Sequence, residues 1–216
     1  MKFPTLPIRL WTAFAAALVS AGCARPAFEA SWRQTLDNAD GGLLRVWSIA
    51  DRSDSLFLRR RAEPVTARMY AAEEFGRLCE GLLTTVRNPQ NEGVGIAAPQ
   101  VGILRRVCIV EDEQGEIIEL INPEIIKTEG EQTGLEGCLS VPGKYGIVTR
   151  PMVVRVRAQD RYGATFEVED EELTARCFCH EIEHLDGHLY TEHCKILSED
   201  ELEKYLREQE KELDEE

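Results

Sequence analysis

His180, Glu181 and His184 are the residues whose types and spacing point most directly to chemistry, because they form the HExxH pattern in the stretch HEIEH. Residues four apart on an α-helix lie on one face, so both imidazoles can hold one metal ion while Glu181 reaches a metal-bound water. The pattern predicts a metal-dependent hydrolase. Two protein ligands do not close a metal site, so the identity of a third ligand decides the class of reaction.

Three interpretations of the two histidines compete. In the first they are a helical pair that holds no metal. In the second the chain is a zinc protease, because HEIEHLDGHLY approaches the longer HExxHxxGxxH pattern and Gly187 is correctly placed. Tyr190 then occupies the position of the third histidine and His188 is out of phase, so a downstream acid such as Glu203 must act as ligand. In the third, a Cys138 thiolate completes a tetrahedral site with one position open for water.

Three motifs of this chain resemble those of peptide deformylase, in the same order and with suitable spacing. They are GVGIAAPQ at 93–100, EGCLS at 136–140 and HEIEH at 180–184, and the resemblance covers about residues 56–197. The chain departs from the family pattern at three positions. Cys179 stands where the family usually has Gln, Glu183 where it has Asp, and Tyr145 where many members carry Arg near the substrate. No proposed ligand is lost by these departures.

The resemblance implies removal of the formyl group from the N-terminal formylmethionine of new bacterial polypeptides. The ligand set that it implies is Cys138, His180 and His184. A metal ion so held lowers the pKa of its bound water, and Glu181 can accept the proton of that water and deliver it to the departing amine. By the same analogy, the backbone N–H of Leu139, the side-chain amide of Gln100 and the metal stabilise the charge that develops on the formyl oxygen.

The resemblance also indicates how a peptide and a metal are bound. Gly95 is expected to offer its backbone to an extended substrate, as a β-strand does. Val94, Leu173 and Cys177 are candidates to line the methionine pocket, with core packing as the alternative for each. Cysteine and histidine ligands suit both zinc and iron. The family pattern favours ferrous iron, with Zn²⁺ or another divalent transition metal as the alternative.

The elements that position these residues follow from hydrophobic periodicity. Apolar residues recur every three or four positions from Thr66 until Asn88-Pro89, which predicts a helix before the first motif. β-Branched runs at 106–110, 116–122 and 153–159, separated by turn sequences, predict antiparallel hairpins. The predicted fold class is α+β, with antiparallel β-sheets packed around a central HExxH helix, an N-terminal helix and a C-terminal helix.

Capping residues predict where two of these helices begin and end. Asp170 is the predicted N-cap of the HExxH helix, and Gly187 fits its C-terminal stop. Ser198 and Glu201 form a predicted capping box at the start of a final acidic helix, residues 198–216. The catalytic domain is expected to span residues 43–197, preceded by a linker at 24–42 that shows no sustained periodicity.

The first 23 residues resemble an export leader. Lys2 and Arg9 precede an uncharged apolar run at 10–19, and small residues precede Cys23, as at a bacterial lipoprotein cleavage site. Ser20 stands where such sites usually carry an aliphatic residue. The expected location is therefore the cell envelope, with possible lipid anchoring at Cys23, and the cytoplasm is the alternative.

Charge limits the partners of the chain. Its 216 residues carry a formal net charge of −14, which disfavours binding to nucleic acid and to anionic membrane surfaces. The expected partners are N-formylmethionyl peptides. An alternative from a different class is a non-catalytic envelope lipoprotein that keeps the fold as a peptide-binding module, although such a protein has no need of Glu181.

Overall fold

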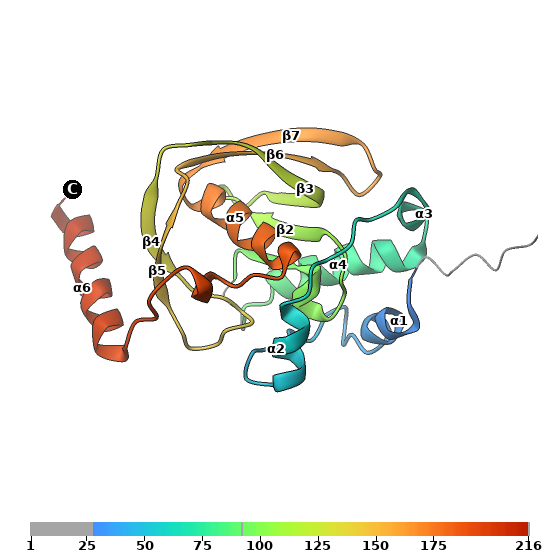
Figure 1. Cartoon of the computed structure of the whole chain (residues 1–216), viewed down its shortest axis with the longest axis horizontal. Helices are drawn as coiled ribbons and strands as arrows, with labels where there is room; N and C mark the ends of the chain where they lie inside the picture. The colour runs from blue at the N-terminus through green and yellow to red at the C-terminus, as the bar shows by residue number, and fades with distance from the viewer. Residues whose placement is uncertain (1–27, 92, 216) are drawn as a thin grey trace, which may run out of the picture.

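Five strands form an antiparallel sheet in the spatial order β1-β2-β3-β6-β7, and two more strands, β4 and β5, form a second sheet (Figure 1). The structure is a computed structural model that describes residues 28–91 and 93–215. The strands are β1 (Gly95–Ala97), β2 (Val107–Glu111), β3 (Ile117–Glu129), β4 (Gln132–Glu136), β5 (Gly146–Arg150), β6 (Val153–Gln159) and β7 (Thr165–Glu171).

Six α-helices and two short 3-10 helices accompany the sheets in the described part of the chain. The α-helices are α1 (Ala30–Asp37), α2 (Arg52–Leu58), α3 (Ala67–Tyr70), α4 (Glu73–Val86), α5 (Glu172–Asp186) and α6 (Glu199–Glu215). The 3-10 helices are η1 (Ala98–Val101) and η2 (Tyr190–Glu192). Helices mixed with antiparallel sheets confirm the predicted α+β class.

The predicted hairpins form, but β3 is longer than its β-branched run. Beyond Ile121 the strand leaves β2 and continues along β6, with a shift of register between Ile121 and Glu124. Asn122 adopts a positive φ of 52° at this shift. The extension depends on pairing with β6, a strand far along the chain, and local periodicity does not report such pairing.

Helix α5 carries the HExxH motif and packs against the five-stranded sheet (Figure 1). Its C-terminus is as predicted, because Gly187 adopts the left-handed conformation with φ 82° and closes the helix. The predicted N-cap at Asp170 is wrong. Asp170 still pairs with Val154 in the β6–β7 ladder, so the helix begins only at Glu172, whose φ of 53° turns the chain from strand to helix.

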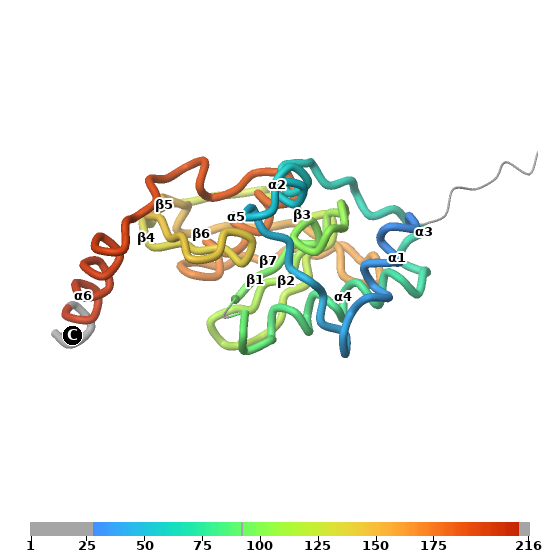
Figure 2. The backbone as a smooth tube through the Cα atoms, turned by 90° about the horizontal axis from the view of Figure 1, so that it is seen from below, coloured from blue at the N-terminus to red at the C-terminus, as the bar shows by residue number. Residues whose placement is uncertain are grey.

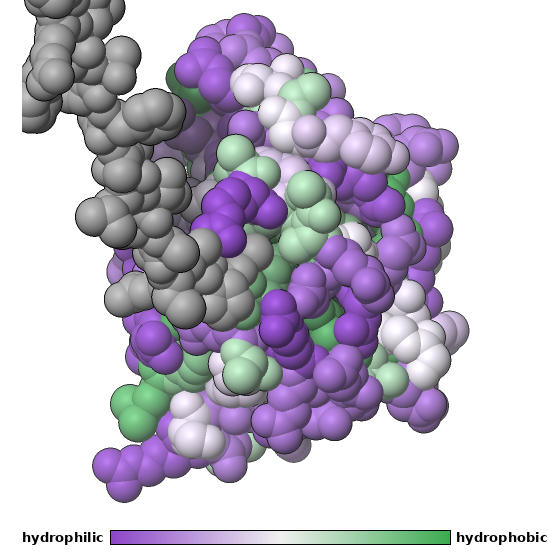
Figure 3. All heavy atoms as spheres, turned by 90° about the vertical axis from the view of Figure 1, so that its right-hand side faces the viewer, coloured by the Kyte–Doolittle hydropathy of each residue, from purple (hydrophilic) through white to green (hydrophobic). Residues whose placement is uncertain are grey.

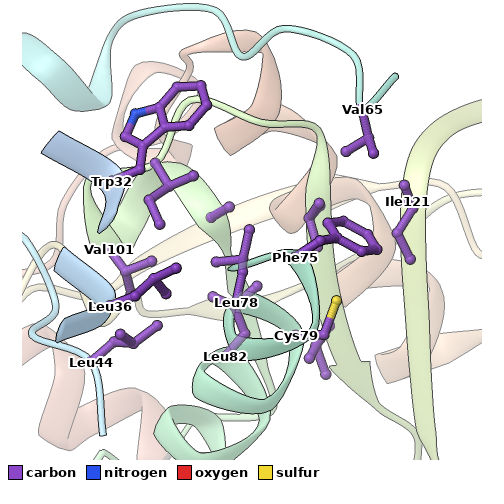
Figure 4. Packing of buried hydrophobic residues seen from close by; sticks show 14 of the residues in the cluster. Trp32, Leu36, Leu44, Val65, Phe75, Leu78, Cys79, Leu82, Val101 and Ile121 are labelled. Carbon is purple, nitrogen blue, oxygen red and sulfur yellow. The ribbon is translucent and has the colours of Figure 1, made fainter. Parts of the chain in front are cut away.

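The helical pattern that starts at Thr66 is divided between α3 and α4. Helix α4 buries the predicted stripe, including Phe75, Cys79 and Leu82, against β1 and β2. Figure 4 shows these side chains facing residues of α1, η1 and β3 in one apolar cluster. This cluster supports β1 and η1, the two elements that carry the first motif.

The prediction that residues 24–42 form a linker is wrong for residues 28–42, the part that the structure describes. Residues 30–37 form α1, and Phe28, Trp32 and Leu36 are buried in the same cluster as α4. Figure 4 shows Trp32 and Leu36 beside the side chains of α4. Their spacing of four residues is one side of a short helix, a signal that can be read from the sequence. The segment is part of the folded domain because its apolar side covers α4.

Helix α6 extends away from the rest of the molecule, at the opposite end from α1 and α3 (Figures 1 and 2). The predicted capping box is present, since the Ser198 N–H donates to Glu201 at 2.8 Å and the Glu201 N–H donates to Ser198 Oγ at 3.3 Å. Among the described residues no helix is long and apolar enough to cross a bilayer. The predicted leader, with Cys23, lies outside the described range and stays a prediction.

Hydrophilic residues prevail on the face of the molecule that Figure 3 shows, and apolar residues there are scattered. This distribution agrees with a chain in which 30% of residues are charged. The larger apolar side chains therefore concentrate in the interior clusters that hold the sheet, α4 and α5 together.

Candidate metal centre and catalytic cleft

A cleft of about 470 Å³ opens between β1, the β4–β5 sheet and α5. It brings together every predicted site residue except His184, which lies deeper, on the next turn of α5. The predicted residues that line it are Val94, Gly95, Gln100, Cys138, Leu139, Leu173, Cys177, His180 and Glu181. Residues from three distant parts of the chain thus meet at one surface.

The three predicted ligands lie together at the base of this cleft. One donor atom from each of Cys138, His180 and His184 lies within 4.8 Å of the other two. Cys138 lies two residues after the end of β4, and its Sγ is 3.2 Å from His184 Nε2. A thiolate and two imidazoles, with one side open to the cleft, fit a four-coordinate transition-metal ion.

The ring of His180 is held in one orientation by two neighbours. Its Nδ1 lies 3.1 Å from a carboxylate oxygen of Glu136, and the ring of Tyr190 stacks on it with centroids 5.8 Å apart and planes at 29°. A hydrogen bond from Nδ1 to the carboxylate leaves Nε2 as the atom that can face a metal. Neither neighbour was predicted as a site residue, although Glu136 opens the EGCLS motif.

Glu136 also joins the metal ligands to two buried arginines. Its carboxylate accepts hydrogen bonds from Arg150 at 2.9 and 3.0 Å and from Arg176 at 3.0 Å. Burial opposes the charge of Glu136, but hydrogen bonds from His180 and Arg150 lower its pKa to about 2. Arg150 also donates to Glu183 at 2.5 Å. The network ties β4, β5 and α5 together behind the metal site.

Glu181 is 4% exposed, and its Oε2 has no hydrogen-bond partner within the described part of the chain. Burial raises the pKa of Glu181 to about 7, and the nearby charge of Glu136 adds to this against the opposing effect of His180. Gly95 makes room for the carboxylate, because a Cβ at Gly95 would lie 2.6 Å from Glu181 Oε1. A buried carboxylate oxygen with no protein partner in the cleft fits the acceptor of a proton from water.

Gln100 directs its amide nitrogen toward the metal ligands. The N–H of Ala97 donates to Gln100 Oε1 at 2.8 Å, which fixes the orientation of the amide. Its Nε2 then lies 3.6 Å from Cys138 Sγ and 3.3 Å from Ser140 Oγ. The amide nitrogen is therefore held beside the metal ligands, with its two N–H groups directed at Cys138 and Ser140.

The three candidate pocket residues differ in environment. Val94 is 43% exposed and Leu173 is 45% exposed, so both present apolar surface to the cleft instead of packing in the core. Cys177 lines the cleft but is also buried in the cluster beneath α5. Burial raises the pKa of its thiol to about 12, so this cysteine is a neutral, apolar part of the wall.

The residues that the protease interpretation requires lie elsewhere. Glu203 is on α6 and pairs with Arg207 at 3.7 Å, while exposed His188 bonds to Glu192 at 2.9 Å. The Tyr190 hydroxyl donates to the Lys144 carbonyl at 2.7 Å. Tyr190 meets His180 only by ring stacking, whereas Cys138 places a ligand atom together with those of both histidines.

Fold and site together indicate an α+β hydrolase of the HExxH type, with a possible metal site at Cys138, His180 and His184. A family model described as polypeptide deformylase matches residues 46–200. The peptide deformylase of Caldanaerobacter subterraneus subsp. tengcongensis is 46% identical over 147 residues, which are 68% of this chain and 89% of that protein. The chain belongs to the peptide deformylase family, whose members are metalloenzymes.

Further relatives agree with this assignment. The peptide deformylase of Lachnoclostridium phytofermentans is 65% identical over 102 residues, or 46% of this chain, and the match spans 63% of that relative, slightly less than two thirds. The class I type b peptide deformylase of Acinetobacter baumannii has a similar structure, with a TM-score of 0.64 and 34% identity over 69% of this chain and 98% of its own. Another structure of that enzyme is described as bound to Met-Ala-Ser. It is 32% identical to this chain, with a TM-score of 0.62, and the match covers 70% of this chain and 98% of its own.

Proposed function

We propose that this protein removes the N-formyl group from the N-terminal formylmethionine of polypeptides. The observation that carries the proposal is the meeting of Cys138, His180 and His184 with buried Glu181 at the base of one cleft. The peptide Met-Ala-Ser, found on the similar Acinetobacter baumannii enzyme, has the form of a product of this reaction. The two sheets arranged around central helix α5 serve as the scaffold that holds these residues.

In this proposal Cys138, His180 and His184 hold a divalent metal ion. When bound, the ion supplies Lewis acidity that activates water at neutral pH. Glu181 takes a proton from the water that attacks the formyl carbon. It then passes that proton to the amine nitrogen as the C–N bond breaks, so the products are formate and a free N-terminus.

Gln100 and Leu139 supply hydrogen-bond donors to the formyl oxygen. The Gln100 amide is already oriented by Ala97, so its nitrogen stays beside the metal ligands, and one N–H exchanges its contact with Cys138 or Ser140 for the formyl oxygen. Leu139 follows ligand Cys138 and lines the cleft, and its backbone N–H is the second proposed donor. Loss of one such donor costs about 3 kcal/mol in the barrier.

The peptide is proposed to bind alongside β1. This strand lies at one edge of the five-stranded sheet, so its outer backbone groups are available to pair with an extended substrate. Gly95, the first residue of β1, offers this backbone. The methionine side chain is proposed to pack against Val94, Leu173 and Cys177, which line the cleft beside the metal ligands.

We propose ferrous iron as the native ion, with Zn²⁺ or another divalent transition metal as the alternative. The donor set supports both, because thiolate and imidazole ligands suit iron and zinc alike. The measurement that decides is metal analysis of protein purified anaerobically from its native cells. Zinc as the main bound metal would contradict the iron proposal.

We further propose that the enzyme acts in the cell envelope, with a lipid at Cys23 as a possible anchor. The proposal rests on the sequence of residues 1–23 alone. Cell fractionation tests it. Native protein found only in the cytosol with residues 1–22 intact would remove this part of the proposal and leave the cytoplasm as the location.

An anaerobic assay of metal-loaded protein on formyl-Met-Ala-Ser tests the reaction itself. The wild type is expected to release formate, whereas Glu181→Ala should lose about 10²- to 10⁴-fold in kcat while it still binds metal. Equal activity of the two proteins would contradict the role of Glu181. Cleavage of internal peptide bonds would favour the protease instead, and peptide binding without formate release by the wild type would favour the non-catalytic module.

A further inference from the structure

A second cavity, also of about 470 Å³, lies between α1 and the segment 45–63 and shares no lining residue with the catalytic cleft. Its walls combine aromatic rings, arginines and small polar groups. The lining residues that the argument uses are Trp32, Arg45, Trp47, Phe57, Arg60 and Arg61. None of them takes part in the proposed deformylation.

Two neighbouring aromatic rings, flanked by two arginines, form one wall of this accessory cavity. The Arg45 guanidinium lies 5.7 Å from the centre of the Trp47 ring, and the Trp47 and Phe57 rings are 4.5 Å apart. Arg60 lies 5.2 Å from the centre of the Phe57 ring. The planes of the two rings are tilted by 51°, so a flat ring packs against one of them at a time. Guanidinium groups bind carboxylate or phosphate through paired hydrogen bonds.

Among the cations of this wall, Arg60 has no ion pair within the described residues, whereas Arg45 pairs with Asp54 at 2.5 Å and Arg61 lies 3.5 Å from Asp186. Two acids also line the cavity. Glu63 is held by Arg105 at 2.5 Å and also lies within electrostatic reach of Arg60, and Glu29 lies at the start of α1. The guanidinium of Arg60 is therefore the group on this wall best placed to take an anion.

Helix α1 supplies the opposite wall. Trp32 is 5% exposed and closes the base, with its ring 4.4 Å from the Arg105 guanidinium. The polar residues that α1 and its C-terminal end add to the lining are Ser31, Gln34, Thr35 and Asn38. All of α1 lies before residue 46, where the match to the family model begins. The cavity is thus completed by a segment outside that match.

The segment that carries the aromatic wall is hydrogen-bonded to η1 and to the loop after β4. The backbone N–H of Trp47 donates to the Gln100 carbonyl at 2.7 Å, and that of Ile49 donates to the Ser140 carbonyl at 2.9 Å. The Trp47 ring lies against the backbone of Gly102, where a Cβ would come within 2.4 Å of it. These contacts hold the aromatic wall in place without any ligand.

We propose that the accessory cavity is a binding site for a small molecule in which a flat ring carries a carboxylate or a phosphate. The ring stacks on the Trp47–Phe57 wall, and the anionic group is held by Arg60. Polar groups of α1 contact the remainder of the ligand. The site is separate from the cleft that binds the formyl-peptide.

Isothermal titration calorimetry on the full-length, metal-loaded protein tests this proposal with two probes. Adenosine monophosphate presents a phosphate and indole-3-acetate presents a carboxylate, so the two probes distinguish the sources of the anion. We expect saturable binding of one molecule per chain for at least one probe. Adenosine and indole, which lack the anionic group, should bind about tenfold more weakly or worse.

Variants place the binding in the accessory cavity. Arg60→Ala should weaken the bound probe about tenfold or more, because a hydrogen-bonded ion pair is lost, and Arg60→Gln should do the same. The matched control is Arg52→Ala, an exposed arginine of α2 outside the lining. That variant should bind the probe as the wild type does.

A product peptide separates this site from the catalytic cleft. Saturation with Met-Ala-Ser should leave the affinity for the probe unchanged within about twofold. The proposal is overturned if neither probe shows saturable binding, if both Arg60 variants bind like wild type, or if the peptide competes with the probe. Every measurement here is a heat of binding. The test therefore gives the same answer whether or not the protein proves to be a deformylase.

Discussion

At the scale of single residues, the candidate metal centre depends on tight contacts that fix the orientation of its functional side chains. Glu181 fits beside β1 only because Gly95 has no side chain, and the Ala97 N–H turns the amide nitrogen of Gln100 toward Cys138. These are preorganised contacts, so the groups that meet the substrate need little rearrangement before reaction.

The first prediction at this scale concerns Gln100. Replacing it by leucine removes both N–H donors at nearly constant volume, so kcat on formyl-Met-Ala-Ser should fall about 10²- to 10³-fold. Steady-state kinetics and metal analysis are the measurements, and metal content should stay at one ion per chain. Gln114→Leu, in the exposed turn between β2 and β3, is the matched control and should leave kcat unchanged. Full activity of Gln100→Leu would exclude its role as an oxyanion donor.

The second residue prediction concerns Glu136, which orients His180 and accepts bonds from Arg150 and Arg176. In Glu136→Gln the carboxylate charge behind the ligand is lost, so affinity for the metal should fall about 10- to 100-fold. Competition with a chelator measures this affinity. Glu131→Gln, in the exposed turn before β4, should behave as wild type. Unchanged affinity in Glu136→Gln would show that the contact does not support the ligand.

At the scale of elements, the site is assembled from an edge strand, a short hairpin and one helix. β1 and η1 are supported from below by α4, and α4 is covered in turn by α1. Helix α1 therefore contributes to the domain although it lies before the part that matches the family model.

The prediction at this scale is that α1 stabilises the whole domain. Leu36→Ala removes a buried side chain from the cluster with α4, so the free energy of unfolding should fall by about 2–5 kcal/mol. Urea denaturation measures this change. Ser31→Ala, exposed on the same helix, should change it by less than about 0.5 kcal/mol. If Leu36→Ala is as stable as the wild type, α1 does not stabilise the domain and residues 24–42 act as a linker.

At the scale of the whole molecule, buried thiols couple folding to alkaline pH. Cys79 is 1% exposed within the main apolar cluster, and burial raises the pKa of its thiol from 9.0 to about 12. The folded state therefore holds this proton more tightly than the unfolded state does. The resulting stability is fully present below pH 9 and is lost as the pH rises from 9 toward 12.

The corresponding experiment compares wild type with Cys79→Ala by urea denaturation at pH 8 and pH 10. Wild type should lose about 1.4 kcal/mol more than the variant between these two values, since one pH unit above the unfolded pKa corresponds to that energy. Other titrating groups affect both proteins equally and cancel in the difference. A difference in stability that does not change with pH would mean that Cys79 is not desolvated in the native state.

Much of the site could be predicted from sequence because its signals are local. The spacing of His180 and His184 places both on one side of a helix whatever surrounds it, and Gly187 ends that helix through its own backbone freedom. The motif order likewise identified Cys138 and Gln100 through resemblance to a family. These predictions needed no knowledge of which elements touch.

Only the tertiary structure decided the contacts between elements that lie far apart in the chain. Asp170 could cap a helix in isolation, but pairing with Val154 keeps it in a strand. The partnership of Glu136 with His180, the coverage of α4 by α1 and the accessory cavity behind Trp47 all join separate segments. Spacing along a helix or strand is encoded residue by residue, whereas which side chains meet across a fold depends on the packing of all elements at once.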